Sequence, residues 1–365
     1  EYLQSGAVLH SMDMMTPAKR EFLETFKDVV LEPRELPYKI MFPGPTGTNT
    51  VEAALKLARR YTGRQHILSF TNAFHGMTLG ALSVTGNSMK RQGAGIPLTN
   101  SSKIPYDDYL DGETPDFIWL ERVLEDSGSG VDKPAAIIVE TVQGEGGLRS
   151  ARFDWLRRLS ELCSEHEILL IVDDVQAGCG RTGTFFSFEE AGIVPDIVCL
   201  SKSISGSGLP MALTLFRAEL DIWSPGEHNG TFRGNNAAFV TATAALKEYW
   251  AQPAFQEQLA GTIDAMHTRL ESIALTTSGA GVRGRGLLSG LVFDDVEAAG
   301  RIAAEAFRAG LLLETSGPQD EVVKIMPPLT VTAEELERGL DILEDAVRTV
   351  TGPAVERSAA EAPSA

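Results

Sequence analysis

Lys202 is the residue whose surroundings most clearly indicate chemistry. It follows the apolar run 197–200 and Ser201, and it precedes a Gly/Ser-rich loop at 203–208. Most lysines are solvated surface residues, but a lysine at the end of a buried strand can lose its solvent. A desolvated lysine amine is nucleophilic toward carbonyl groups. The loop would leave room for a bulky adduct, so the pattern indicates covalent chemistry at the Lys202 amine.

Asp173 is a second candidate, because it ends the apolar run 168–172. A carboxylate at the end of a parallel strand lies at the carboxyl edge of the sheet, where α/β proteins bind ligands. When buried, it requires a cationic or hydrogen-bonding partner. A protonated pyridine nitrogen would serve, and the ion pair would keep the ring an electron sink. Taken alone, Asp173 could equally be a helix cap or a metal ligand.

A third candidate is the small-residue run 44–50, Gly-Pro-Thr-Gly-Thr-Asn-Thr, which leads into a helical pattern starting at Val51. Backbone N–H groups at such a helix start can bind an anion. We expect a phosphate at Gly47 and Thr48, with an ordinary helix cap as the alternative. The spacing is not that of a Walker A loop. A phosphate loop, a strand-end Asp and a strand-end Lys in this order are more specific together than any one alone.

These residues require a sheet that brings strand ends to one edge. Several runs are continuously apolar, as expected of parallel strands covered on both faces, and helical patterns separate them. The candidate strands are Ile67–Phe70, Ala136–Glu140, Ile168–Asp173, Ile197–Leu200 and Ala212–Phe216. The order predicts an α/β domain with a large, mostly parallel sheet.

The pattern changes after Asn236, where long helical stretches lead into a smaller α+β arrangement. Thr332 and Glu335 form a T-x-x-E capping box for a last helix. We therefore predict a large cofactor-binding domain at 1–236, connecting helices and a small C-terminal domain at 237–350, and a disordered tail at 351–365.

Composition narrows the possible partners. The net charge of −18 argues against nucleic acid or an anionic membrane surface. The three cysteines are widely spaced and lack a C-x-x-C pair, so we expect neither zinc nor a disulfide framework. No apolar run approaches the roughly 18–20 residues that span a bilayer. We expect a cytoplasmic protein with no metal site and no nucleic-acid or membrane partner.

The motifs resemble the class III (ω-) aminotransferases, which are fold-type I enzymes dependent on pyridoxal 5′-phosphate. The resemblance covers roughly Thr46 to Val347. The matching motifs, in order, are Pro45–Lys56, Phe74–Gly76, Glu140–Gly147, Val172–Gly183, Leu200–Lys202 and Gly230–Asn235. It implies a fold-type I transferase with a large mostly parallel-sheet domain and a smaller α+β C-terminal domain.

The resemblance also implies roles for individual residues. Lys202 would hold pyridoxal 5′-phosphate as a Schiff base and move the proton between substrate and cofactor, and Asp173 would pair with the pyridine nitrogen. The remaining implied contacts are Gln176 at the ring hydroxyl, Val175 and Phe74 on the two ring faces, Gly47 and Thr48 at the phosphate, and Thr231 at the phosphate of a neighbouring subunit. The active unit would therefore be at least a homodimer.

Two further residues concern the substrates, a small amino donor and a 2-oxo acid. Glu145 matches a glutamate that, in the family, pairs with an arginine and releases it when a second carboxylate binds. Lys324 stands where that arginine is expected, before Pro327 and Pro328. A lysine supplies the charge but not the bidentate fork. Members of the family also carry an N-terminal segment that contributes to the substrate pocket and the dimer, and this sequence lacks it. We expect either that the segment has been cut away or is disordered, or that its absence weakens substrate binding.

Within the family, the runs 42–49, 196–213 and 225–236 resemble members that interconvert aspartate 4-semialdehyde plus glutamate and 2,4-diaminobutyrate plus 2-oxoglutarate, the first step of ectoine synthesis. The alternatives are another ω-aminotransferase, acting on ornithine, acetylornithine or 4-aminobutyrate, and an aminomutase of the same fold. A non-catalytic protein would require Lys202 and Asp173 to be idle.

Overall fold

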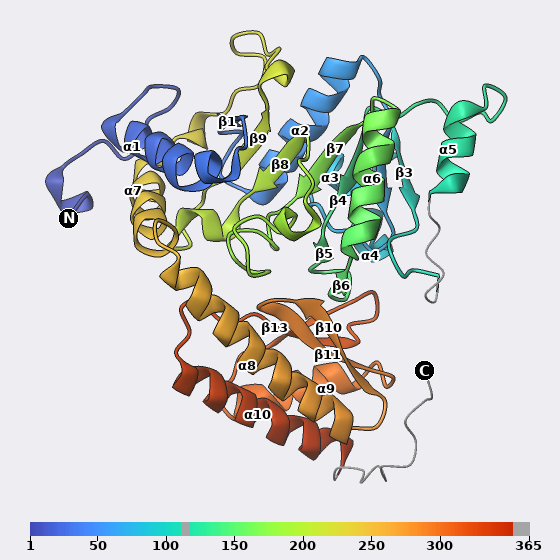
Figure 1. The fold of residues 1–365 in the computed structure, drawn as a ribbon, viewed down its shortest axis with the longest axis vertical. Helices are drawn as coiled ribbons and strands as arrows, with labels where there is room; N and C mark the ends of the chain where they lie inside the picture. Colours follow the sequence, from blue (N-terminus) through green and yellow to red (C-terminus); the bar gives the residue numbers. More distant parts are fainter. Residues whose placement is uncertain (111–116, 353–365) are drawn as a thin grey trace. The chain divides into compact units, whose positions relative to one another are not determined.

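The computed structural model describes residues 1–110 and 117–352 and divides the chain into two compact units (Figure 1). Unit 1 comprises Glu1–Gln143 and Ala151–Gln256, and unit 2 comprises Gly144–Ser150 with the chain from Glu257 onward. Residues 237–256, which the sequence analysis placed with the C-terminal part, belong to unit 1. Apart from its first two residues, the tail predicted at 351–365 lies outside the described residues.

Unit 1 is built on a seven-stranded sheet in the order β1-β9-β8-β7-β4-β2-β3. Five neighbouring strands are parallel: β3 (Ser101–Ile104), β2 (Ile67–Phe70), β4 (Ala136–Val139), β7 (Leu169–Asp173) and β8 (Ile197–Leu200). β9 (Leu213–Arg217) is antiparallel to β8, and β1 (Tyr38–Met41) is antiparallel to β9. The predicted mostly parallel α/β sheet is confirmed, and β2 and β8 have the predicted bounds.

Helices cover both faces of this sheet, which explains why its strands are apolar throughout. In β7, Leu170 and Val172 pack in one core cluster with residues of α6, whereas Leu169 and Ile171 pack in another with residues of α2. The described helices of unit 1 are α1 (Pro17–Phe26), α2 (Gly47–Thr62), α3 (Leu79–Val84), α4 (Ser88–Gln92), α5 (Ile118–Glu125), α6 (Phe153–Glu165) and α7 (Asn236–Ala245), and a short strand β5 (Val142–Gln143) also lies there.

Unit 2 contains a four-stranded sheet in the order β10-β11-β13-β12, in which every neighbouring pair is antiparallel. Its elements are β6 (Arg149–Ser150), α8 (Ala254–Thr276, which starts just before the unit boundary), β10 (Ala280–Arg285), β11 (Leu288–Phe293), α9 (Ala298–Arg308), β12 (Glu314–Ser316), β13 (Val322–Ile325) and α10 (Ala333–Thr351). Apolar residues of the sheet and the three helices form one separate core. This is the predicted α+β arrangement.

The start of α10 shows how the sequence sets a helix boundary. The backbone N–H of Glu335 donates to Thr332 Oγ1 at 3.2 Å, and that of Thr332 donates to Glu335 Oε2 at 3.1 Å. The predicted capping box is therefore confirmed. None of the helices in 1–110 or 117–352 combines the length and the apolar character required to cross a membrane.

Candidate active site

The carboxyl edge of the parallel strands brings together Asp173 and the segment carrying Lys202. Asp173 is the last residue of β7 and lies opposite Cys199 of β8. Lys202 follows Cys199 by three residues and begins a short 3-10 turn, Lys202–Ser205. Because adjacent parallel strands end at the same edge, the two predicted site residues belong to one local region, as the sequence analysis expected.

Lys202 has a backbone conformation that few lysines adopt. Its φ is +50°, in the left-handed region, which costs a residue with a side chain about 1 kcal/mol. The preceding residue, Ser201, is held by a 2.8 Å hydrogen bond from its hydroxyl to the carbonyl of Met211. The left-handed turn ends the strand sharply, and the Lys202 side chain is exposed at the strand end. The fold thus presents this amine at the edge of the sheet.

The Asp173 carboxylate is buried and accepts two hydrogen bonds. His75 Nδ1 lies 2.7 Å from Oδ2, and the backbone N–H of Val175 donates to Oδ1 at 3.2 Å. Since an ionised carboxylate can only accept, Nδ1 carries the hydrogen. The His75 side chain is fully buried, and its Nε2 has no hydrogen-bond partner within the described part of the chain. The sequence analysis had only the motif 74–76 as a signal for this histidine.

Phe74 is anchored through its backbone and is flanked by a cation. Its N–H donates to Oε2 of the buried Glu140 at 2.9 Å, which ties the segment after β2 to the end of β4. Lys90 of α4 places its Nζ 4.2 Å from the centroid of the Phe74 ring. The sequence analysis did not single out Lys90, because nothing local to residue 90 distinguishes it from a surface lysine.

The start of α2 packs directly against the segment that follows Asp173. A Cβ added to Gly47 would lie only 2.9 Å from Val175 Cγ1, so only glycine allows this close approach. The next residue, Thr48, pairs its hydroxyl with that of Thr78 at 2.7 Å. The first N–H groups of a helix have no acceptor inside the helix, so this start can bind an anion beside Val175 and the half-buried Gln176.

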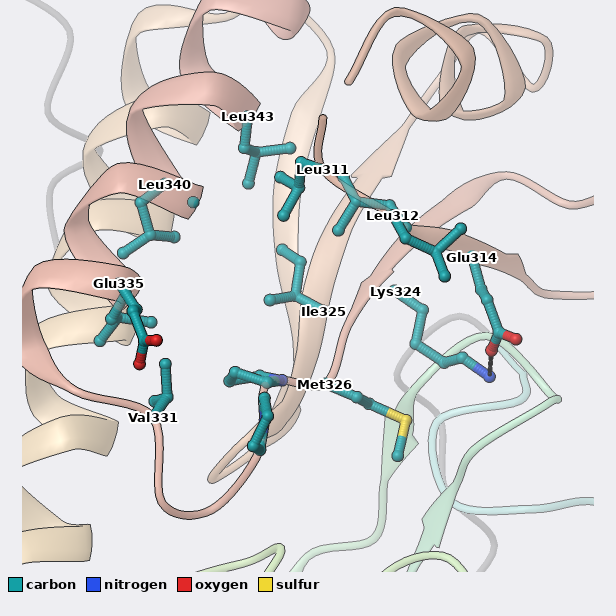
Figure 2. Close-up of a pocket in the computed structure, with 15 residues that line it drawn as sticks. Leu311, Leu312, Glu314, Lys324, Ile325, Met326, Val331, Glu335, Leu340 and Leu343 are labelled. Carbon is teal, nitrogen blue, oxygen red and sulfur yellow. Dashed lines mark ion pairs between the residues drawn. The ribbon is translucent and has the colours of Figure 1, made fainter. Parts of the chain in front are cut away.

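Lys324 and Glu145 form the ion pair that the sequence analysis expected between them, within unit 2. Lys324 is 4% exposed, and its Nζ lies 2.9 Å from Glu145 Oε1. A second carboxylate, that of Glu314, lies 3.1 Å away (Figure 2). Burial by itself would lower the pKa of Lys324, but the two carboxylates outweigh it and raise that pKa. The involvement of Glu314 was not predicted.

Strand pairing explains both contacts of Lys324. Glu314 of β12 lies directly opposite Lys324 of β13. The loop that carries Glu145 is tied to β12, because the Ser316 hydroxyl donates to the Gly144 carbonyl at 2.7 Å. Lys324 and Glu314 also line a cavity of about 580 Å³ whose other walls are mainly apolar residues of 311–343 (Figure 2).

Thr231 is not joined to the residues around Asp173. It begins the short turn Thr231–Arg233 and is exposed, and within the described residues its side chain makes no hydrogen bond. Arg233 of the same turn pairs with Asp13. The role expected for Thr231 in a neighbouring subunit stays a prediction.

The site of unit 1 fits a phosphorylated pyridine. Asp173 offers a buried carboxylate for a ring nitrogen, and the start of α2 offers N–H groups for a phosphate. The close packing of Gly47 against Val175 brings the start of α2 next to the segment that follows Asp173. In contrast, no group of three or more His, Cys, Asp or Glu residues within 1–110 and 117–352 is arranged to hold a metal ion.

Comparison with known proteins agrees with this fit. The family described as Aminotransferase class-III matches residues 8–347. The chain therefore belongs to the class III aminotransferases.

Individual relatives extend this finding. A diaminobutyrate–2-oxoglutarate transaminase from Streptomyces anulatus is 62% identical over 348 residues, which covers 95% of this chain and 83% of the relative. One from Halalkalibacterium halodurans is 58% identical over 353 residues, covering 96% and 82%. Among solved structures, a PLP-bound amine transaminase from an uncultivated Pseudomonas species has a TM-score of 0.82 at 25% identity, covering 95% of this chain and 85% of that one. A lysine aminotransferase from M. tuberculosis, at 24% identity and a TM-score of 0.82, covers 96% and 84% and shares the fold.

Proposed function

We propose that this aminotransferase interconverts L-aspartate 4-semialdehyde plus L-glutamate and L-2,4-diaminobutyrate plus 2-oxoglutarate, as the first step of ectoine synthesis. Its cofactor is pyridoxal 5′-phosphate. The observation that carries the mechanism is the meeting of Asp173, Val175, Gly47 and the Lys202 turn at one sheet edge. The substrate choice is supported by relatives of 58–62% identity that bear the diaminobutyrate–2-oxoglutarate transaminase name.

When bound, the cofactor supplies an electron sink that stabilises negative charge on the substrate carbon. The Lys202 amine would hold it covalently and then, once released, carry a proton to and from that carbon. This side chain is exposed at the strand end, where a bound molecule can reach it. The left-handed backbone turn at Lys202 fixes the direction in which its side chain leaves the strand end.

Asp173 would hold the proton on the pyridine nitrogen, because a buried carboxylate favours a cationic partner. His75 would keep this carboxylate oriented through the 2.7 Å hydrogen bond. The remaining proposed contacts are Val175 and Phe74 on the ring faces, Gln176 at the ring hydroxyl, and Gly47 and Thr48 at the phosphate. Aromatic stacking on Phe74 would contribute about 0.5–1.5 kcal/mol.

Glu145 and Lys324 are proposed to act at the second carboxylate of glutamate and 2-oxoglutarate, for which the pair would open. Their 2.9 Å ion pair supports an interaction between the two side chains. Lys324 offers a point charge, so it would bind a carboxylate with less angular precision than an arginine. We further propose a cytoplasmic homo-oligomer, at least a dimer, in which Thr231 reaches the cofactor of the neighbouring subunit.

The first experiment is an absorption spectrum of the protein with pyridoxal phosphate, recorded before and after adding 2,4-diaminobutyrate without a 2-oxo acid. We expect a band near the visible edge that the amine bleaches, and neither the band nor the bleaching in Lys202→Ala. A band that diaminobutyrate leaves unchanged would refute the substrate, and a band that persists in Lys202→Ala would refute the role of Lys202.

Two further comparisons separate the alternatives. Ornithine, acetylornithine and 4-aminobutyrate should bleach the band far less than diaminobutyrate at equal concentration. Turnover should also require an added 2-oxo acid, whereas an aminomutase would proceed without one.

A further inference from the structure

Three cations of α4 and β3 have no carboxylate partner within the part of the chain that the structure describes. They are Lys90 and Arg91 of α4 and Lys103 of β3. Within residues 1–110 and 117–352, none of them has an Asp or Glu oxygen within 4.0 Å. The chain carries 50 acidic and 32 basic residues, so counter-ions are abundant. Lys90 and Arg91 are adjacent in the chain, and the charge of Arg91 contributes to lowering the pKa of Lys103, so the three residues form one local group of positive charge.

Lys90 is the cation nearest to the candidate active site. Its Nζ lies 4.2 Å from the Phe74 ring centroid, and its backbone N–H is fixed by Asn87 Oδ1 at 3.0 Å. Phe74 is held by Glu140, and the next residue, His75, bonds to Asp173. The half-buried ammonium therefore contacts a segment that is itself hydrogen-bonded to the Asp173 carboxylate. A cation over an aromatic face is held only weakly, so a bound anion could engage it.

Arg91 and Lys103 add positive potential around Lys90. Lys103 Nζ donates to the Ser83 carbonyl, and none of the described carboxylates balances its charge. Burial, and next to it the charge of Arg91, lower the pKa of Lys103 to about 8. The Arg91 Nε is buried without a hydrogen-bond partner in the described chain. An anion close to these groups would relieve their mutual repulsion.

We propose that Lys90 binds the substrate carboxylate whose carbon lies three bonds from the reacting carbon, which is C1 of 2,4-diaminobutyrate, with Arg91 and Lys103 supplying the surrounding positive potential. This inference rests on the proposed function and adds to it a specificity-determining residue. In 2,4-diaminobutyrate and aspartate 4-semialdehyde the reacting carbon is C4, and the C1 carboxylate is at this distance. In glutamate and 2-oxoglutarate the reacting carbon is C2, and the C5 carboxylate is at the same distance, so the basic group is suited to both halves of the reaction.

The test compares two amines that differ by this carboxylate alone. 2,4-Diaminobutyrate carries it, and 1,3-diaminopropane is the same molecule without it. In Lys90→Met, the concentration of diaminobutyrate that half-saturates bleaching of the cofactor band should rise about 10- to 100-fold, as expected for a lost charge-assisted hydrogen bond. The value for diaminopropane should change less than about 3-fold, and the limiting rate should stay similar for both amines. Lys90→Arg should restore most of the affinity.

Lys27→Met is the matched control, because it removes one exposed surface cation that pairs with Glu32. It should leave both amines unaffected. An equal loss for both amines in Lys90→Met would overturn the proposal, since Lys90 would then act by shaping Phe74. An unchanged affinity for diaminobutyrate would overturn it as well.

A second measurement separates this inference from the proposed function. Calorimetric binding of glutarate, an unreactive dicarboxylate, does not require turnover. Weaker glutarate binding by Lys90→Met than by the wild type would support the carboxylate site even if neither amine bleached the cofactor band, in which case only the proposed substrate reaction would fail. Equal glutarate binding by the two proteins would overturn the site.

Discussion

Each unit holds a lysine that is partly or fully withdrawn from solvent, and the surroundings shift the pKa values of these two lysines in opposite directions. In unit 2, Lys324 is almost fully buried, yet Glu145 and Glu314 outweigh the effect of burial and raise its pKa. In unit 1, Lys103 has no carboxylate partner among the described residues, and burial together with Arg91 lowers its pKa to about 8. The Lys90 ammonium contacts the Phe74 ring and has no ion-pair partner within 1–110 and 117–352.

This difference separates a cation that is already paired before a ligand binds from one that is not. Lys324 has two counter-ions inside its own unit, so a carboxylate that binds to it must compete with Glu145 and Glu314. Within the described residues no carboxylate neutralises the group around Lys90, and the free energy of that imbalance can be recovered when an anion binds. The following substitutions test this contrast.

The largest expected effect is on stability. Lys324→Met should destabilise unit 2 by about 2 kcal/mol, because it leaves two carboxylates without their cation, although both are partly solvated. Lys90→Met should cost less than about 1 kcal/mol, since only a cation–π contact is lost. Hydrogen–deuterium exchange followed by mass spectrometry would report β12 and β13 separately from α4.

Tryptophan fluorescence provides an internal control for that experiment. All four tryptophans lie in unit 1, so urea unfolding followed by fluorescence should shift little in Lys324→Met. Equal protection of β13 in wild type and Lys324→Met would contradict the structural role assigned to this lysine.

A second expected effect is a pH dependence of opposite sign at the two lysines. The pKa of Lys103 is lowered, so the unfolded chain binds more protons between pH 8 and 10.5, and the contribution of Lys103 to stability rises across that window. The pKa of Lys324 is raised, so its contribution is complete below 10.5 and is lost as the pH rises through the folded-state value.

The measurement is the difference in unfolding free energy between the wild type and each methionine variant, from pH 7 to 11. For Lys103→Met this difference should become more favourable to the wild type above pH 8. For Lys324→Met the difference in unfolding free energy should become less favourable to the wild type, and only above about pH 10.5. The same sign in both series would remove the contrast between the two lysines.

The smallest expected effect concerns the two carboxylates of Lys324. Glu145→Gln and Glu314→Gln should each cost less than about 1 kcal/mol, because the remaining carboxylate still neutralises the ammonium. The double substitution should cost more than the sum of the two, since the buried charge then has no counter-ion. Thermal unfolding of the four proteins gives this coupling, and strict additivity would show that neither carboxylate compensates for the loss of the other.

Where a feature depends on neighbouring residues in the chain, the sequence predicted it well. The apolar runs of β2 and β8 have the predicted bounds, and the Thr332–Glu335 capping box is present. The sequence analysis did not find β1 or β10. β10 contains two glycines and two arginines, and its strand conformation depends on pairing with β11.

The sequence by itself determined the family motifs, the strand-end positions of Lys202 and Asp173, and a helix after the small-residue run 44–50, because apolar periodicity and turn chemistry are local. It placed the start of that helix at Val51, whereas α2 begins at Gly47. Tertiary structure alone decided which side chains meet. His75 and Asp173 are 98 residues apart in the chain, and Glu145 and Lys324 are 179 apart. Glu314 reaches Lys324 through strand register, and Lys90 reaches Phe74 through the placement of a short helix. Such contacts depend on the packing of distant segments, and so does the balance of charge that distinguishes the two lysine environments.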